Sequence, residues 1–181
     1  MSSINVITAG PSAGKSSTIR DLSANGYRTL PEAARILFDQ RISEGIDPET
    51  VKQSDQFHKQ VEKIDRRIEE QLQTISETVF LDRSLADNIA YRKHFGNDSP
   101  AVIDELRDET EDRYDNVFIL ERIDFEDDSV RTEDEAEATQ IHNQLVDVYE
   151  NMINANVFHV ELMPVDKRTA YITERTITVN E

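Results

Sequence analysis

Several features are missing from this sequence of 181 residues. It contains no cysteine, which excludes disulfide bonds and every metal site built on thiolates. It contains no apolar run of 18 or more residues, so we expect no transmembrane helix and no membrane partner. The N-terminus shows no basic segment followed by an apolar stretch, so we expect no secretory signal.

Lysine is also scarce. Only six of the 20 basic residues are lysine, against 37 acidic residues, and the net charge is −17. At molar salt the Debye length is only about 3 Å, so surface carboxylates no longer repel one another strongly. A lysine-poor, acidic surface is therefore typical of a halophilic source, with an ordinary acidic cytosolic protein as the alternative. In either case we expect no nucleic-acid partner, because nucleic-acid binding requires basic patches.

The segment A-G-P-S-A-G-K-S-S (Ala9–Ser17) is the most informative motif. It lies between a short apolar run and a segment that can form a helix, which is the context of a phosphate-binding loop, or P-loop. The unpaired N–H groups at a helix N-terminus attract phosphate. Lys15 can place its ammonium between the β- and γ-phosphates, and the Ser16 hydroxyl can bind Mg²⁺. We expect a nucleoside triphosphate, ATP with Mg²⁺, to bind along Ala9, Gly10, Pro11, Ser12, Ala13, Gly14, Lys15, Ser16 and Ser17.

A glycine-rich turn without a ligand is the alternative interpretation of this segment. A P-loop and the missing secretory signal together indicate a cytoplasmic protein. No guanine-reading N-K-x-D motif is present, which favours ATP over GTP.

Strands alternate with helices along the chain, which predicts an α/β domain with a parallel sheet covered on both faces. No repeat, linker or low-complexity segment divides residues 1–181, so we expect one domain. The expected strands are Asn5–Thr8, Tyr27–Leu30, Thr78–Asp82, Asn116–Leu120 and Val157–Leu162. The expected helices run from the P-loop to Ala24 and over 32–43, 47–77, 84–94, 100–111, 133–155 and 164–176.

The expected helix over 47–77 is unusually long. Its apolar residues recur at spacings of three and four and form one narrow stripe. One interpretation is a face packed on the domain, and the other is the seam of a homodimer, so a monomer and a homodimer both stay open. The stripe consists of Phe57, Val61, Ile64, Ile68, Leu72 and Ile75.

Asp82 is the last residue of an apolar strand. In an open parallel sheet, ligands bind outside the carboxyl ends of the strands, beside the first strand-to-helix loop. A carboxylate there can hold Mg²⁺ together with Ser16, or accept a proton from an attacking hydroxyl. A helix N-cap is the alternative role for Asp82.

Arg83 and the helix after it supply further candidates. Arginine binds phosphoryl groups well, so Arg83 could contact the acceptor or the transferring phosphoryl group. Asp87 and Tyr91 lie four residues apart on one helix face, and we expect them to contact the substrate. A surface ion pair is the alternative for Arg83. We interpret Arg92 and Lys93 as a solvated helix end.

Glu32 and Arg35 begin the helix that follows the second strand, again near the carboxyl ends of the sheet. They are candidates for contact with an acceptor substrate. They stand one turn apart, so a simple ion pair on the helix surface is the alternative.

The segment 121–135 follows the fourth strand and is rich in carboxylates. A charged hairpin at this place can close over a triphosphate as a lid, and Arg131 is the better candidate for a lid arginine than Arg122. A solvated acidic loop is the alternative. The four histidines show no metal-ligand spacing, so we expect surface or core positions for them.

These motifs together resemble the AAA_28-type ATPase/kinase family of P-loop proteins. That family is similar to the kinase domain that phosphorylates ribosylnicotinamide and, more distantly, to nucleoside and nucleotide kinases. The resemblance rests on the P-loop, on P-E-A-A-R at 31–35, on L-D-R-S-L-A-D-N-I-A-Y at 81–91 and on D-S-V-R-T-E-D at 128–134.

The resemblance implies an adenylate-kinase-like, three-layer fold whose five parallel strands follow the order 2-3-1-4-5. It further implies that Lys15 and Ser16 serve phosphate and Mg²⁺, that Asp82 and Arg83 serve metal and acceptor, and that Arg131 belongs to the lid.

We therefore expect a P-loop kinase that transfers the γ-phosphoryl group of ATP to a small, nucleoside-like acceptor. Catalysis would rest mainly on positioning and charge stabilisation by Lys15, Asp82, Arg83 and Arg131. One alternative is a regulatory NTPase switch that binds a partner protein, and another is a catalytically inactive structural domain.

Overall fold

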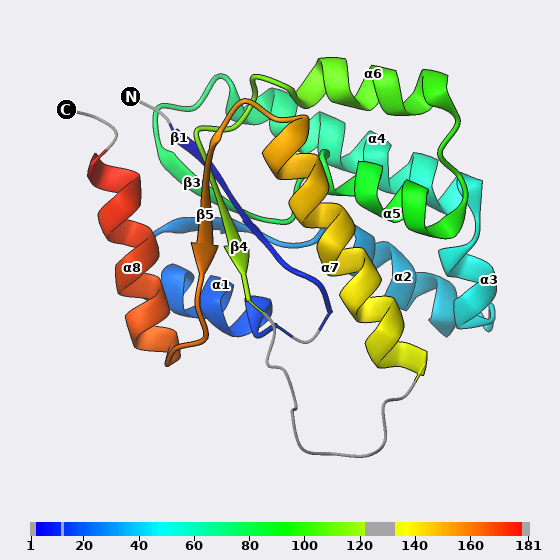
Figure 1. Cartoon of the computed structure of the whole chain (residues 1–181), viewed down its shortest axis with the longest axis horizontal. Helices are drawn as coiled ribbons and strands as arrows, with labels where there is room; N and C mark the ends of the chain where they lie inside the picture. Colours follow the sequence, from blue (N-terminus) through cyan, green and yellow to red (C-terminus); the bar gives the residue numbers. More distant parts are fainter. Residues whose placement is uncertain (1–2, 12, 122–132, 179–181) are drawn as a thin grey trace.

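Five parallel strands form a single sheet in the order β2-β3-β1-β4-β5, as predicted (Figure 1). The computed structural model describes residues 3–11, 13–121 and 133–178. β1 occupies the centre, where Val6 pairs with Leu81 of β3 on one side and with Val117 of β4 on the other. The strands are β1 (Ser3–Thr8), β2 (Arg28–Leu30), β3 (Thr78–Asp82), β4 (Asn116–Leu120) and β5 (Asn156–Val160).

Helices cover both faces of this sheet. Alternate residues of a strand face opposite sides, and the core is accordingly divided in two: Val6 packs with the helices after β3 and β4, and Ile7 packs with α1 and α8. None of the described helices has the length and apolar character that a membrane crossing requires. The helices are α1 (Lys15–Ala24), α2 (Ala33–Ser43), α3 (Pro48–Lys52), α4 (Asp55–Leu72), α5 (Asp87–Phe95), α6 (Pro100–Thr110), α7 (Glu133–Asn151) and α8 (Val165–Thr178).

The prediction of one long helix over 47–77 is wrong. α3 ends at Lys52, and α4 begins after Ser54, whose hydroxyl accepts a hydrogen bond from the Phe57 N–H at 3.3 Å. Ser54 has an extended backbone, and a serine followed by an acidic first turn is a good helix N-terminus. α4, which begins after this break, contacts α5.

The buried face of α4 also differs from its apolar stripe. Val61 and Leu72 of the stripe are buried, but Ile64 is exposed, whereas Glu62 and Glu69 are buried. These two acids accept hydrogen bonds from groups that lie after β3, among them Arg92 and the Leu85 N–H. α4 therefore packs on the domain through buried ion pairs as well as through apolar contacts.

The interpretation of Arg92 as part of a solvated helix end is also wrong. Only 1% of its surface is exposed, so it is not part of a solvated helix end. Its guanidinium binds Glu62, donates to Asp55 at 2.9 Å and donates to the Asn97 carbonyl at 2.8 Å. Arg92 thereby joins α5 to the start of α4.

Candidate functional site

The P-loop joins β1 to α1, as its motif predicts. Gly14 stands at the N-cap of α1 with φ +76°, a left-handed conformation that side chains disfavour. Gly14, Ser16 and Ser17 are exposed, so the start of α1 is open to a phosphate group. Of the other loop residues, Ala9, Gly10 and Ala13 are buried, Pro11 is half-buried, and Ser12 lies outside the described residues.

Lys15 links the P-loop to the carboxyl ends of two strands. Its Nζ contacts the carboxylate of Asp82, at the end of β3, and Glu32 Oε2 at 2.9 Å, at the start of α2. The Lys15 side chain is only 8% exposed. Three residues that are far apart in the sequence therefore converge beside the P-loop.

Arg83 completes this cluster. Its Nε donates to Glu32 Oε1 at 2.9 Å, and its guanidinium lies 4.9 Å from the ring centroid of Tyr91. Within the described residues, Arg83 is the one non-glycine residue with positive φ, at +70°. Such a conformation costs about 1–3 kcal/mol, and strain of this kind clusters at functional sites. Because its side chain is only 12% exposed, Arg83 is no surface ion pair.

The two carboxylates beside Lys15 are held in different electrostatic states. Burial by itself would raise the pKa of Glu32, but Arg83 and Lys15 together hold that pKa below its usual value. Burial also raises the pKa of Asp82, and there it outweighs the opposing effect of Lys15. Glu32 is therefore the more firmly ionised of the two at neutral pH.

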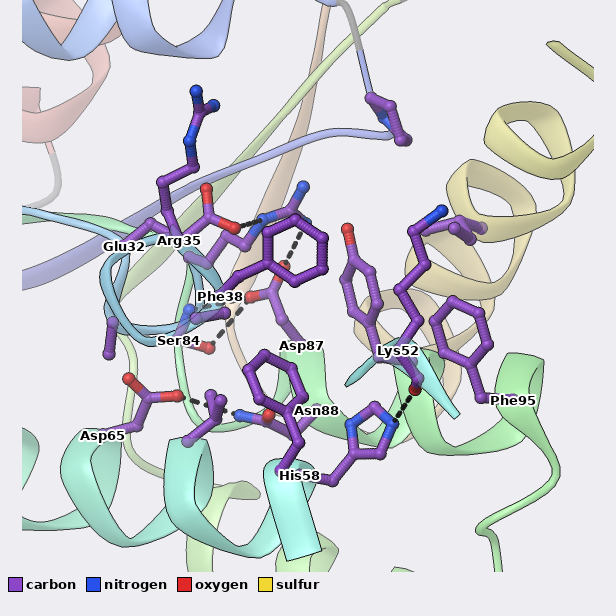
Figure 2. Close-up of a pocket in the computed structure, with 18 of the residues that line it drawn as sticks. Glu32, Arg35, Phe38, Lys52, His58, Asp65, Ser84, Asp87, Asn88 and Phe95 are labelled. Atoms are coloured by element: carbon purple, nitrogen blue, oxygen red, sulfur yellow. Dashed lines mark hydrogen bonds and ion pairs between the residues drawn. The ribbon is translucent and has the colours of Figure 1, made fainter. Parts of the chain in front are cut away.

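A cavity of about 360 Å³ opens beside this cluster (Figure 2). Glu32 and Arg83 face it from the P-loop side, and aromatic rings from three other segments form much of its wall. Asp82 does not line it. The lining comprises Pro11, Glu32, Ala33, Ala34, Arg35, Phe38, Lys52, Phe57, His58, Val61, Asp65, Arg83, Ser84, Asp87, Asn88, Tyr91, Phe95, Glu137, Ala138 and Ile141.

Asp65 and Asn88 form a polar pair in this mostly apolar lining. Asn88 Nδ2 donates to Asp65 Oδ2 at 2.9 Å, a contact drawn in Figure 2. Asp65 Oδ1 and Asn88 Oδ1 have no hydrogen-bond partner within the described residues, and neither is a fully buried atom. Burial raises the pKa of Asp65 to about 7, with smaller contributions from Glu69, Asp87 and Glu32. The cavity therefore offers two adjacent polar groups to a ligand.

A match to a known family extends over nearly the whole of the chain. The family model described as an AAA domain, AAA_28, matches residues 5–168. The chain belongs to the AAA_28 family. This agrees with the resemblance carried by the P-loop and by the Asp82–Tyr91 segment.

Solved kinases share the fold of this AAA_28 protein. Deoxyadenosine kinase from M. mycoides, with dCMP and dCDP bound, is 16% identical with a TM-score of 0.66, over 97% of this chain and 99% of that one. Thymidylate kinase from Ehrlichia chaffeensis is 15% identical with a TM-score of 0.62, over 97% and 98%. Thymidylate kinase from Candida albicans is 15% identical with a TM-score of 0.63, over 98% and 92%. No curated protein matches the sequence significantly.

Two further predicted site residues of the AAA_28 protein, Asp87 and Arg35, differ in their exposure to solvent. Asp87 is buried and accepts hydrogen bonds from Thr8 Oγ1 and from the Tyr149 hydroxyl, both at 2.5 Å, so it ties β1 to α5 and α7. Arg35 lies at the rim of the cavity, with its side chain 72% exposed and 3.5 Å from Asp39. The alternative pairing of Glu32 with Arg35 is not formed.

The lid segment and the histidines are the remaining sequence-predicted features. Arg131 and most of the segment 121–135 lie outside the described residues. Within the parts of the chain that are described, no group of three or more acidic or histidine side chains could hold a metal ion. His142 Nδ1 accepts a hydrogen bond from the Gly10 N–H at 3.3 Å, a contact between α7 and the P-loop that the sequence did not predict.

The donors beside the P-loop fit Mg²⁺. Asp82 and Glu32 offer carboxylate oxygens and Ser16 offers a hydroxyl, and Mg²⁺ prefers such hard oxygen ligands. In nucleotide sites this ion is held by one or two carboxylates together with the phosphates, so a cage made only of protein groups is not required.

Proposed function

We propose that this protein is a kinase that transfers the γ-phosphoryl group of ATP to a hydroxyl of an uncharged, nucleoside-sized acceptor. One observation carries the proposal: the cavity opens on Glu32 and Arg83, and Glu32 also contacts the P-loop lysine. The volume of about 360 Å³ lies within the range of small-molecule sites, about 300–1,000 Å³.

The charges around the cavity favour an uncharged acceptor over a phosphorylated one. Carboxylates outnumber cationic side chains in the lining, so a phosphorylated acceptor would bring further negative charge to an acidic wall. The carboxylates are Glu32, Asp65, Asp87 and Glu137, and the cationic side chains are Arg35, Lys52 and Arg83. The aromatic walls would instead hold a planar ring.

The positions of the side chains support distinct roles in the transfer. Glu32 lines the cavity whereas Asp82 does not, and this position favours Glu32 as the group that takes the proton of the acceptor hydroxyl. The hydroxyl oxygen then bonds to the γ-phosphorus, and the bond from that phosphorus to the bridging oxygen breaks to release ADP. Lys15 and Arg83 stabilise the charge on the phosphoryl oxygens. Asp82 and Ser16 would hold Mg²⁺, which supplies further positive charge there.

The proposal is tested by incubating the protein with ATP, Mg²⁺ and a panel of ribonucleosides, deoxyribonucleosides and hydroxyl-bearing vitamins. Mass spectrometry is expected to show one class of acceptor gaining a phosphoryl group, and Lys15→Ala is expected to abolish the product. Tight ATP binding without any phosphorylated acceptor would contradict the proposal. ADP release at a rate that no acceptor changes would indicate a simple NTPase instead.

The acceptor KM is expected to depend on pH through Asp65. A protonated Asp65 can donate to the acceptor ring while Asn88 Oδ1 accepts from it. Since the pKa of Asp65 is about 7, the protonated fraction is high below pH 7 and falls about tenfold per unit above it. The acceptor KM should rise correspondingly between pH 7 and 9 in the wild type.

Asp65→Asn provides the matched variant, because an amide presents a donor at every pH. Its acceptor KM is expected to stay constant over pH 7–9. The KM for ATP, followed in the same assays, controls for the titration of ATP. His58 does not interfere, because burial lowers its pKa below the usual value and it is neutral over this range. An equally steep profile in Asp65→Asn would assign the dependence to another group.

A further inference from the structure

Arg168, in the first turn of α8, lies directly behind the P-loop. Its Nη1 donates to the Gly14 carbonyl at 3.3 Å and to Thr18 Oγ1 at 3.0 Å, with a longer contact to the Ala13 carbonyl at 3.5 Å. Its Nη2 donates to the Met163 carbonyl at 3.2 Å. Only 5% of its surface is exposed. A guanidinium is thus enclosed among backbone carbonyls on the protein side of the phosphate-binding turn.

The positive charge of Arg168 has no carboxylate to balance it within the described residues. The other buried arginine side chains differ in this respect, because Arg83 and Arg92 each bind two carboxylates. The Nε of Arg168 is buried without a hydrogen-bond partner, and burial lowers the pKa of this guanidinium. An unpaired buried charge is costly, and in a chain with 37 acidic residues a carboxylate partner would have been easy to supply.

The contacts of Arg168 also orient the loop. In a trans peptide unit the C=O and the following N–H point in opposite directions. Holding the carbonyls of Ala13 and Gly14 towards Arg168 therefore turns the N–H groups of Gly14 and Lys15 to the other side, where a phosphate would bind. A Cβ added at Gly14 would lie 2.9 Å from Arg168 Nη1, so the guanidinium approaches the loop closely at the glycine whose positive φ the turn requires.

We propose that Arg168 is a positioning residue for the P-loop and that the phosphate chain of the bound nucleotide is the anion that balances its charge. The proposal rests on the triphosphate site of the proposed function. It goes beyond that function by assigning part of the affinity for phosphate to a side chain that does not touch the nucleotide. The same unbalanced charge destabilises the folded protein when no nucleotide is bound.

The test compares Arg168→Met with the wild type by calorimetry, using ATP, ADP and adenosine. We expect the Kd for ATP to rise at least tenfold, the Kd for ADP to rise less, and any binding of adenosine to be unchanged, because the effect scales with phosphate charge. The melting temperature without nucleotide is expected to stay level or to rise, because an unbalanced buried charge is removed. Arg168→Lys keeps the positive charge but lacks the planar set of donors of a guanidinium. Its Kd for ATP should therefore lie between the values of the wild type and of Arg168→Met.

Arg175→Met, seven residues further along α8, is the matched control and should leave the three affinities unchanged. An unchanged ATP affinity in Arg168→Met would overturn the proposal. So would a lower melting temperature without nucleotide together with equal losses for adenosine and ATP, because that result describes a structural residue. If the wild type itself binds no ATP, the proposed function fails first and this inference fails with it.

Discussion

Replacing Glu32 with glutamine is expected to slow phosphoryl transfer by about 10²–10⁴-fold, the usual contribution of a general base. Glutamine keeps the shape of the side chain but cannot take a proton, and its one amide oxygen can replace only one of the two oxygens that bind Lys15 and Arg83. The loss of the base should appear in kcat, and the Kd for ATP, measured alongside, reports any disturbance of Lys15. Single-turnover assays with the acceptor identified from the panel measure the effect.

Glu44→Gln is the matched control for this substitution. Glu44 caps α2, is exposed and pairs with Arg41, away from the cavity. Its variant should transfer phosphate at the wild-type rate. If Glu32→Gln retained most of its activity while Asp82→Asn lost it, the base would be Asp82 and the assignment of Glu32 would be wrong.

Removing the Arg92 side chain is expected to produce the largest loss of stability. Arg92→Met leaves Glu62 buried without its partner, and breaking a buried ion pair in this way costs about 3–5 kcal/mol. For a chain of this size each kcal/mol lowers the melting temperature by about 2–4 °C. Denaturant unfolding followed by circular dichroism measures the free energy of unfolding directly.

The double variant Arg92→Met/Glu62→Leu should recover most of that loss, because it removes both charges and keeps apolar volume. Arg107→Ala breaks only exposed ion pairs with Asp104 and Asp108, and should change the free energy of unfolding little. A loss in Arg92→Met no larger than that in Arg107→Ala would contradict the structural importance of the Arg92 pair.

Local sequence patterns predicted the sheet and the P-loop side of the site well. Most of the strands are short apolar runs bounded by turns, and each expected strand formed within two residues of its expected limits. Asp82, Arg83 and Glu32 could be placed near the P-loop because parallel strands end at one edge of the sheet. These inferences needed only the order of elements along the chain.

The acceptor cavity could not be predicted in the same way. Phe38, Phe57 and Phe95 belong to α2, α4 and α5, and they line one cavity in a fold in which α4 restarts after Ser54. The signal for that restart, Ser54 followed by Asp55, was present but was outweighed by the continuous apolar stripe. The partners of Asp65 and Arg168 likewise depend on tertiary packing and leave no local pattern.

α7 contacts both binding regions, and this has a thermodynamic consequence. His142 accepts a hydrogen bond from the Gly10 N–H of the P-loop, while its neighbour Ile141, and Ala138 one turn earlier, line the cavity. An acceptor that shifts α7 must then also alter the P-loop. Linkage is reciprocal, so whatever factor the acceptor imposes on ATP affinity, ATP must impose on acceptor affinity. A single helix would thus make the two substrates of the proposed kinase bind cooperatively.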